Sequence, residues 1–160
     1  MIQKLLLPNK YKIVGWLILI PATILGIILI FTDFEGIPLN TKSFAIVNNN
    51  IFGGNQFFTF IDTNITNTVV GILFIAGALL VGFSKEKNED EFIGNLRQSS
   101  LLWAVLVNYI LLLFSFVFIY GTTFLSVMIY NMFTVLIIFI AKFNYNLYRS
   151  SKSMSGEKYN

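Results

Sequence analysis

Two uncharged apolar runs, 101–120 and 122–141, restrict the possible folds more than any other feature of the sequence. Only Gly121 separates them. A helix of about 20 residues is about 30 Å long, and the hydrocarbon core of a bilayer is about equally thick. The two runs therefore predict two membrane-spanning helices that fold back on each other near Gly121.

Each run carries a polar pair near its middle, and the two pairs are equally far from the point between residues 119 and 120. They are Asn108 with Tyr109 and Tyr130 with Asn131. We call these four residues the polar clamp, because interhelical hydrogen bonds between such groups stabilise a hairpin by about 0.6–2 kcal/mol. The alternative is that they line a small polar path for a ligand or ion. Neither run contains Asp, Glu, Lys or Arg, the usual residues of ion paths, and this favours the clamp.

Two further apolar runs, 13–31 and 65–83, complete the predicted architecture. The chain is 56% hydrophobic and 12% charged, far from the average of soluble proteins. We expect an all-α membrane protein over 1–160, a single domain with four transmembrane helices in two hairpins. Small residues recur at spacings of seven and four in each of these two runs and predict close packing between them: Gly15, Ala22, Gly26, Gly71, Ala78 and Gly82.

The segment 32–64 is predicted to be an extracytoplasmic loop. Its residues 43–47 and 57–61 are rich in β-branched and aromatic side chains, and Gly53-Gly54-Asn55 lies between them. This pattern predicts a short β-hairpin on the membrane surface. A second interpretation is an aromatic anchor in the membrane interface, formed by Phe57, Phe58 and Phe60.

The segment 84–100 is the charged connector between the second and third spans. Asn88 and Glu91 fit a capping box, so a helix is expected to begin near Glu89 and to continue into the third span. This amphipathic segment is a candidate cytoplasmic docking element through Phe92, Ile93, Leu96 and Arg97. The alternative is a solvated connector whose acids pair locally with Arg97. The tail 143–160 is predicted to be mobile.

Charge predicts the orientation of the chain in the membrane. Of 11 lysine and arginine residues, only Lys42 lies in 32–64. Basic residues concentrate on the cytoplasmic side, so both termini and the connector are expected in the cytoplasm. The basic residues of the tail are too sparse to predict nucleic-acid binding.

The stretches DEFIGNLRQSSLLWAVLVNYILLL (90–113) and VMIYNMFTVLIIFIAKFNYNLYR (127–149), with the YG between them, resemble small uncharacterised four-span inner-membrane proteins of bacteria. The likeness covers roughly the C-terminal half of the chain. It implies a bacterial plasma membrane and four helices. It implies no activity and no functional residue.

Composition also narrows the possible functions. The chain has no cysteine and no histidine, so thiol catalysis and the usual zinc and copper sites are not expected. No catalytic, cofactor-binding or metal-binding residues are predicted, and an enzyme is the least favoured class. We expect a non-catalytic membrane protein that acts through contacts with a protein partner or with its own copies. The alternative is a small oligomeric transporter or channel with a polar path near Asn108 and Asn131.

Overall fold

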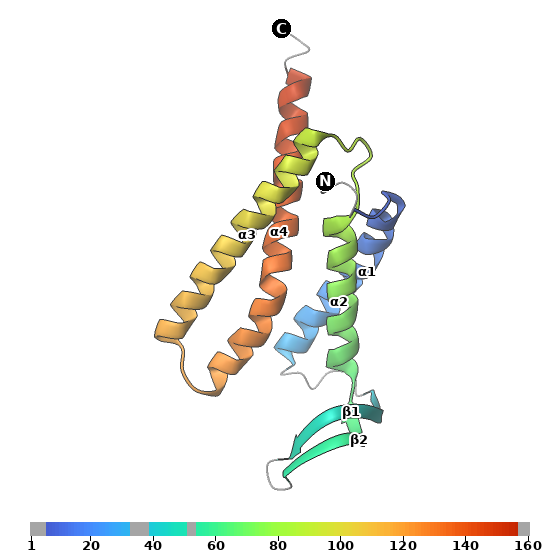
Figure 1. Cartoon of the computed structure of the whole chain (residues 1–160), viewed down its shortest axis with the longest axis vertical. Coiled ribbons are helices and arrows are strands. Elements are labelled where there is room, and N and C mark those ends of the chain that lie inside the picture. The colour runs from blue at the N-terminus through green and yellow to red at the C-terminus, as the bar shows by residue number, and fades with distance from the viewer. Residues whose placement is uncertain (1–5, 33–38, 51–53, 157–160) are drawn as a thin grey trace. The chain divides into compact units, whose positions relative to one another are not determined.

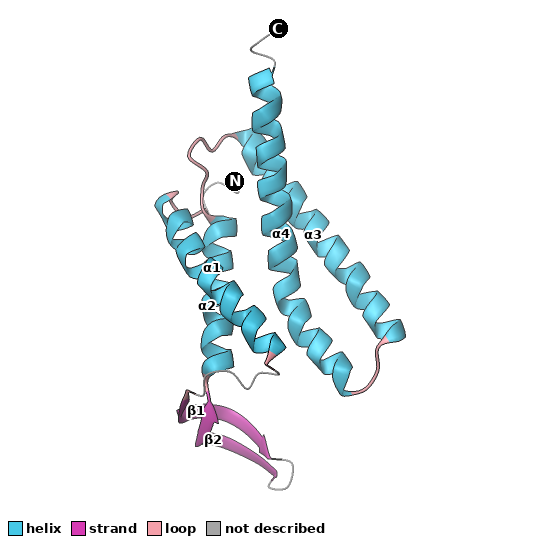
Figure 2. Ribbon diagram, turned by 180° about the vertical axis from the view of Figure 1, so that it is seen from behind, coloured by secondary structure: helices cyan, strands magenta, loops and turns pink. Residues whose placement is uncertain are grey.

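The computed structural model describes residues 6–32, 39–50 and 54–156, which form four helices and one two-stranded antiparallel sheet (Figures 1 and 2). All four helices are long and apolar enough to cross a membrane. The elements follow the chain in the order α1 (Lys10–Phe31), β1 (Asn40–Asn50), β2 (Gly54–Asn64), α2 (Thr66–Phe83), α3 (Glu91–Phe118) and α4 (Thr122–Gly156).

The chain divides into two compact units. One comprises Met1–Leu19 and Ile75–Asn160, and the other comprises Ile20–Phe74. The first unit holds α3, α4, the start of α1 and the end of α2. The second holds the sheet with the remaining parts of α1 and α2.

Helices α3 and α4 form the predicted hairpin in the first unit. The turn between them uses Gly121 at φ 74°, a left-handed conformation that glycine adopts without steric cost. The backbone N–H of Ile119 donates to Ser115 at 2.9 Å and ends α3. The buried residues of α3 recur on one face: Arg97, Ser100, Ala104, Asn108 and Ser115.

The N-terminus of α3 differs from the predicted capping box. Asp90 is the N-cap, and its carboxylate accepts the backbone N–H of Ile93 at 2.8 Å. The predicted pair, Asn88 with Glu91, is therefore wrong by two residues. The chemistry of the cap is the expected one, because an Asp or Asn side chain at the N-cap accepts a hydrogen bond from a free N–H in the first turn of the helix.

Helix α4 extends far beyond its predicted end at 141. It continues to Gly156, so the predicted end of the fourth helix is wrong, and 157–160 lie outside the described residues. The mobility of the tail stays a prediction. The extension is held by packing, because Phe143 is only 1% exposed. Asn146 also donates to Ser100 Oγ at 3.2 Å. Neither glycine nor proline interrupts the chain between 142 and 155 to end the helix earlier.

Small residues allow close contact between α1 and α2, as predicted, but one of them contacts α4 instead. A Cβ at Gly15 would lie 2.8 Å from the backbone of Val81, and a Cβ at Gly77 would lie 2.8 Å from the backbone N of Leu19. Gly82, predicted to face the first span, instead packs against the Phe139 ring of α4. Gly77 was not part of the predicted pattern. In the second unit the contact is looser, since a Cβ at Gly26 would lie 3.9 Å from Val70.

The β-hairpin is present and longer than predicted. Strands β1 and β2 have 11 residues each, and the register pairs Phe44 with Phe60 and Ala45 with Thr59. The predicted turn at Gly53 and the break at 33–38 lie outside the described residues.

Candidate functional site

The polar clamp is built around two asparagines that face each other across α3 and α4. Asn108 Nδ2 donates to Asn131 Oδ1 at 3.1 Å, and Asn131 Nδ2 donates back to Asn108 Oδ1 at 3.2 Å. Asn108 is only 6% exposed. Each amide therefore satisfies one donor and one acceptor of the other inside an otherwise apolar helix pair.

The two tyrosines of the clamp are placed differently from the asparagines. Tyr109 is 61% exposed and lies on the outer surface of the helix pair. Tyr130 is half-buried, and its backbone carbonyl accepts the Thr134 hydroxyl at 2.9 Å. The structure thus brings Asn108 and Asn131 together directly and leaves Tyr109 outside their contact.

Two further contacts between α3 and α4 lie toward the connector and were not predicted. Lys142 Nζ is 4.4 Å from the centre of the Trp103 ring, a cation–π distance. Ser100 and Asn146 form the second contact. The reflection that aligns the asparagines does not align these pairs, because Trp103 with Lys142 and Ser100 with Asn146 are displaced from it by about two helical turns.

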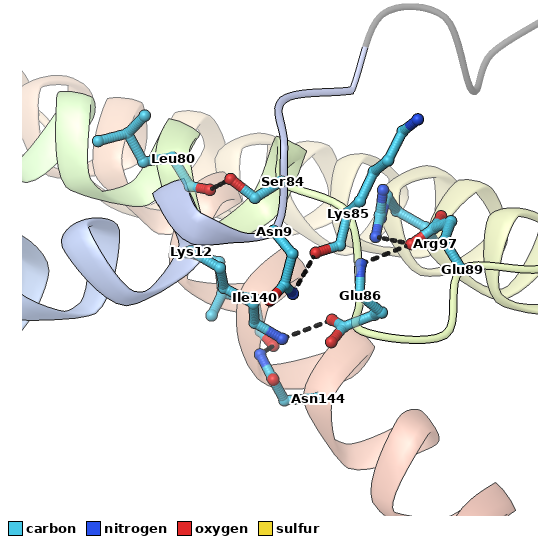
Figure 3. A network of polar contacts seen from close by, with 10 residues as sticks. All are labelled: Asn9, Lys12, Leu80, Ser84, Lys85, Glu86, Glu89, Arg97, Ile140 and Asn144. Atoms are coloured by element: carbon cyan, nitrogen blue, oxygen red, sulfur yellow. Dashed lines mark hydrogen bonds and ion pairs between the residues drawn. The ribbon is translucent and has the colours of Figure 1, made fainter.

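The connector forms a polar network with the N-terminal segment (Figure 3). Leu7 forms a parallel bridge with Ser84, in which Leu7 N donates to Phe83 O at 3.0 Å and Lys85 N donates to Leu7 O at 2.8 Å. Asn9 Nδ2 then donates to Lys85 O at 2.7 Å. These bonds satisfy backbone groups that the end of α2 would otherwise leave open.

Two ion pairs continue this connector network to α1 and α3. Lys12 of α1 pairs with Glu86, and Arg97 Nη2 of α3 lies 3.0 Å from Glu89 Oε2. The same Glu89 oxygen accepts the backbone N–H of Glu86 at 2.7 Å, which joins the two pairs (Figure 3). The Arg97 guanidinium also stacks on the Phe143 ring of α4, at 4.9 Å from its centre.

Arg97 therefore corrects the predicted docking set. Its side chain is buried, with Glu89 on one side and Phe143 on the other, so it cannot present a charge to a partner. The local pairing expected as the alternative is present, but the pair is buried and not solvated. Ile93 and Leu96 are half-buried, and only Phe92 is strongly exposed, at 50%.

The Arg97–Glu89 pair is incompletely satisfied by protein groups. Among the described residues, Glu89 Oε1 and Arg97 Nε and Nη1 are buried without a hydrogen-bond partner. Burying two charges in this way costs several kcal/mol of solvation for each ion, and their mutual contact, the Glu86 N–H and the Phe143 ring offset part of that cost. The pair consequently depends on both partners being present.

Within the described ranges, no group of three or more Asp or Glu side chains is placed to hold a metal ion. Comparison with known proteins found no matching family model, no similar curated protein and no similar solved structure. The fold and its sites define a mostly helical protein with four candidate membrane-spanning helices and a small two-stranded sheet.

Proposed function

We propose that this chain is a non-catalytic multi-pass protein of the bacterial inner membrane that acts through contacts with another protein. It serves as an accessory subunit or as the membrane partner of a cytoplasmic regulator. In this proposal the connector and both termini face the cytoplasm, as the distribution of lysine and arginine indicates.

The surface of α3 supports the membrane assignment. Four large aliphatic side chains along this helix are each more than half exposed: Leu102, Leu106, Ile110 and Leu113. Full burial of such a side chain is worth about 1.5–3 kcal/mol, so leaving all of them in water would be unfavourable. Hydrocarbon removes this cost.

The observation that carries the contact function is the form of the connector end of α3. Phe92 is half exposed there, between the exposed Asp90 and Glu91 and the exposed Asn95. The connector network fixes this start of the helix through the Arg97–Glu89 pair. A fixed, exposed aromatic side chain among polar neighbours is typical of a protein contact site.

The reciprocal bonds of Asn108 and Asn131 favour this function over a small oligomeric transporter or channel. Amide groups that satisfy each other are not directed toward a passing solute. A polar path would also need charged groups in the span, and the described part of α3 between 98 and 118 contains none.

The test is purification of the full chain in a mild detergent, followed by native mass spectrometry. We expect a second polypeptide at fixed stoichiometry, lost when Phe92→Ser is introduced. Gln98→Ser is the matched control, because Gln98 is exposed on another face of the same helix. Recovery of the chain alone or only with its own copies would contradict the proposal. Solute flux in vesicles that depends on Asn108 would favour the transporter instead.

A further inference from the structure

The β-hairpin carries an exposed cluster of large apolar side chains on one face. The rings of Phe44 and Phe60 lie 5.4 Å apart, and those of Phe44 and Phe58 lie 6.4 Å apart. Ile46 points to the same side, because side chains alternate along a strand. These four residues, which we call the aromatic face, are between 53% and 72% exposed. A contiguous exposed apolar surface of this kind marks an interaction site.

Phe58 adds a second indication, because its backbone is strained. Its φ is 52°, in the left-handed region that costs a side-chain-bearing residue roughly 1–2 kcal/mol. Its ring is 72% exposed, so contacts within the chain compensate for little of this cost. Backbone strain of this kind clusters at functional positions, which is a second reason to look for a ligand of this face.

The opposite face of the same hairpin differs in character. Near the base of the hairpin its positions Ser43, Ala45 and Thr59 are small or polar and half-buried. Toward the turn it carries the register partners Val47 and Phe57, which are 56% and 62% exposed. Ala45 and Thr59 are register partners, next to the register pair of Phe44 and Phe60. The two faces of the hairpin therefore differ in its base half, whereas both faces are apolar toward the turn.

The base of the hairpin is tied directly to the first turn of α2. Only Ile65 separates β2 from the helix, and its N–H donates to Leu39 O at 3.1 Å. Leu39 N donates to Thr66 Oγ1 at 3.3 Å, and Asn64 Oδ1 accepts the N–H of Thr66 at 3.0 Å. Hairpin and helix start belong to the same compact unit, and the strands run across the axis of α2 (Figures 1 and 2).

We propose that the aromatic face lies in the lipid–water interface at the start of α2, where the boundary of the acyl chains covers it. The inference rests on the membrane assignment made under the proposed function. If α2 spans the bilayer, a hairpin that crosses its axis at its first residue lies along the membrane surface. Amphipathic elements at this position bury their apolar face by about 5–10 Å. The lipid that surrounds a membrane-spanning α2 would then extend over the aromatic face.

Charge also favours lipid over a charged protein partner. The charged residues of the two strands are Lys42 and Asp62, which are register partners at the base of the hairpin. The aromatic face beyond them is uncharged. An isolated two-stranded hairpin is marginally stable in water, so a covering phase would add to the stability that the contacts with α2 provide.

The test uses single nitroxide labels on the full chain in phospholipid vesicles, which is simple because the sequence has no native cysteine. Labels at Phe44→Cys and Phe60→Cys probe the aromatic face. Ala45→Cys and Thr59→Cys are matched controls on the opposite face. The measured quantity is the ratio of collision with oxygen, which concentrates in the acyl chains, to collision with a water-soluble nickel chelate. We expect this ratio to be higher at 44 and 60 than at 45 and 59. Ile46→Cys replaces either phenylalanine variant that fails to fold.

Two results would overturn the lipid contact. Equal access of the nickel chelate to all four positions would show that the aromatic face is in water. Spin–spin broadening at 44 and 60 that disappears on dilution with unlabelled chain would show that a second copy covers it. A label at Leu106→Cys, exposed in the middle of α3, separates this failure from that of the membrane assignment. Nickel access at 106 would refute the membrane assignment and the hairpin contact together.

Discussion

At the scale of single residues, the interior of α3 and α4 depends on groups that satisfy each other. Asn108 and Asn131 exchange two hydrogen bonds, so neither amide is unpaired in the helix interface. Replacing only one asparagine of such a pair is unfavourable, because the amide of the other is then buried without a hydrogen-bond partner.

Replacing Asn108 alone should therefore be worse than replacing both asparagines. We expect Asn108→Leu to lower the free energy of unfolding by about 1–2 kcal/mol, since an interhelical bond is lost and Asn131 is left unpaired. Adding Asn131→Leu should recover part of the loss. Unfolding in mixed micelles measures both variants, with Tyr109→Phe on the outer surface as the control. Additive losses would show that the two amides do not act as a pair.

The glycines offer a matched comparison of the same kind. A Cβ at Gly77 would lie 2.8 Å from the backbone N of Leu19, whereas a Cβ at Gly94 would meet nothing within 4 Å. Gly77→Ala should cost about 1–3 kcal/mol, because backbone cannot move aside cheaply. Gly94→Ala should stabilise the protein by up to about 1 kcal/mol through helix propensity. Thermal unfolding in detergent distinguishes them, and equal shifts would contradict close packing at Gly77.

At the scale of elements, the connector network joins the N-terminal segment, the end of α2 and the start of α3. Its links are the bridge of Leu7 with Ser84 and the ion pairs at Glu86 and Glu89. Arg97, the one charged residue of the predicted docking set, thus pairs within the protein. Under the proposed function, the candidate docking residue that remains exposed here is Phe92.

Breaking the buried pair should be the most damaging polar change in this region. The side chains of Arg97 and Glu89 are 6% and 7% exposed, so Glu89→Gln leaves a guanidinium buried without its counter-charge. We expect a loss of about 3–5 kcal/mol in the free energy of unfolding. Glu91→Gln, two residues along at an exposed position, should change it by less than about 0.5 kcal/mol. Indistinguishable unfolding of the two variants would refute the assigned role of the pair.

At the scale of the whole molecule, the four candidate spans and the distribution of basic residues predict one orientation. The hairpin should lie outside the cytoplasm and the connector inside. The absence of native cysteine allows a direct measurement with a membrane-impermeant maleimide on spheroplasts, in which the outer membrane is opened and the inner membrane stays intact. Gln56→Cys should react from outside, and Asn88→Cys should react only after lysis. The reverse pattern would show that the predicted orientation is inverted. Reaction at both sites before lysis would show that α2, which lies between them, does not cross the membrane.

Much of the helical architecture could be predicted from local pattern. Uncharged runs of sufficient length predicted four helices, and the turn at Gly121 predicted which depths of α3 and α4 meet. The ends of the elements were less predictable. Helix α4 continues to Gly156 because Phe143 and Asn146 contact α3 and its neighbours, and such contacts are invisible in the hydropathy of the tail.

The sequence by itself determined the length and apolar character of the helices, the position of the turn and the alignment of Asn108 with Asn131. Tertiary structure alone decided what each face meets: Arg97 turns inward to Glu89 and Phe143, and Gly82 meets Phe139 of α4. The physical reason is that helical periodicity specifies which residues share a face. The neighbour of that face depends on how all the helices pack together, and this packing is a property of the folded chain.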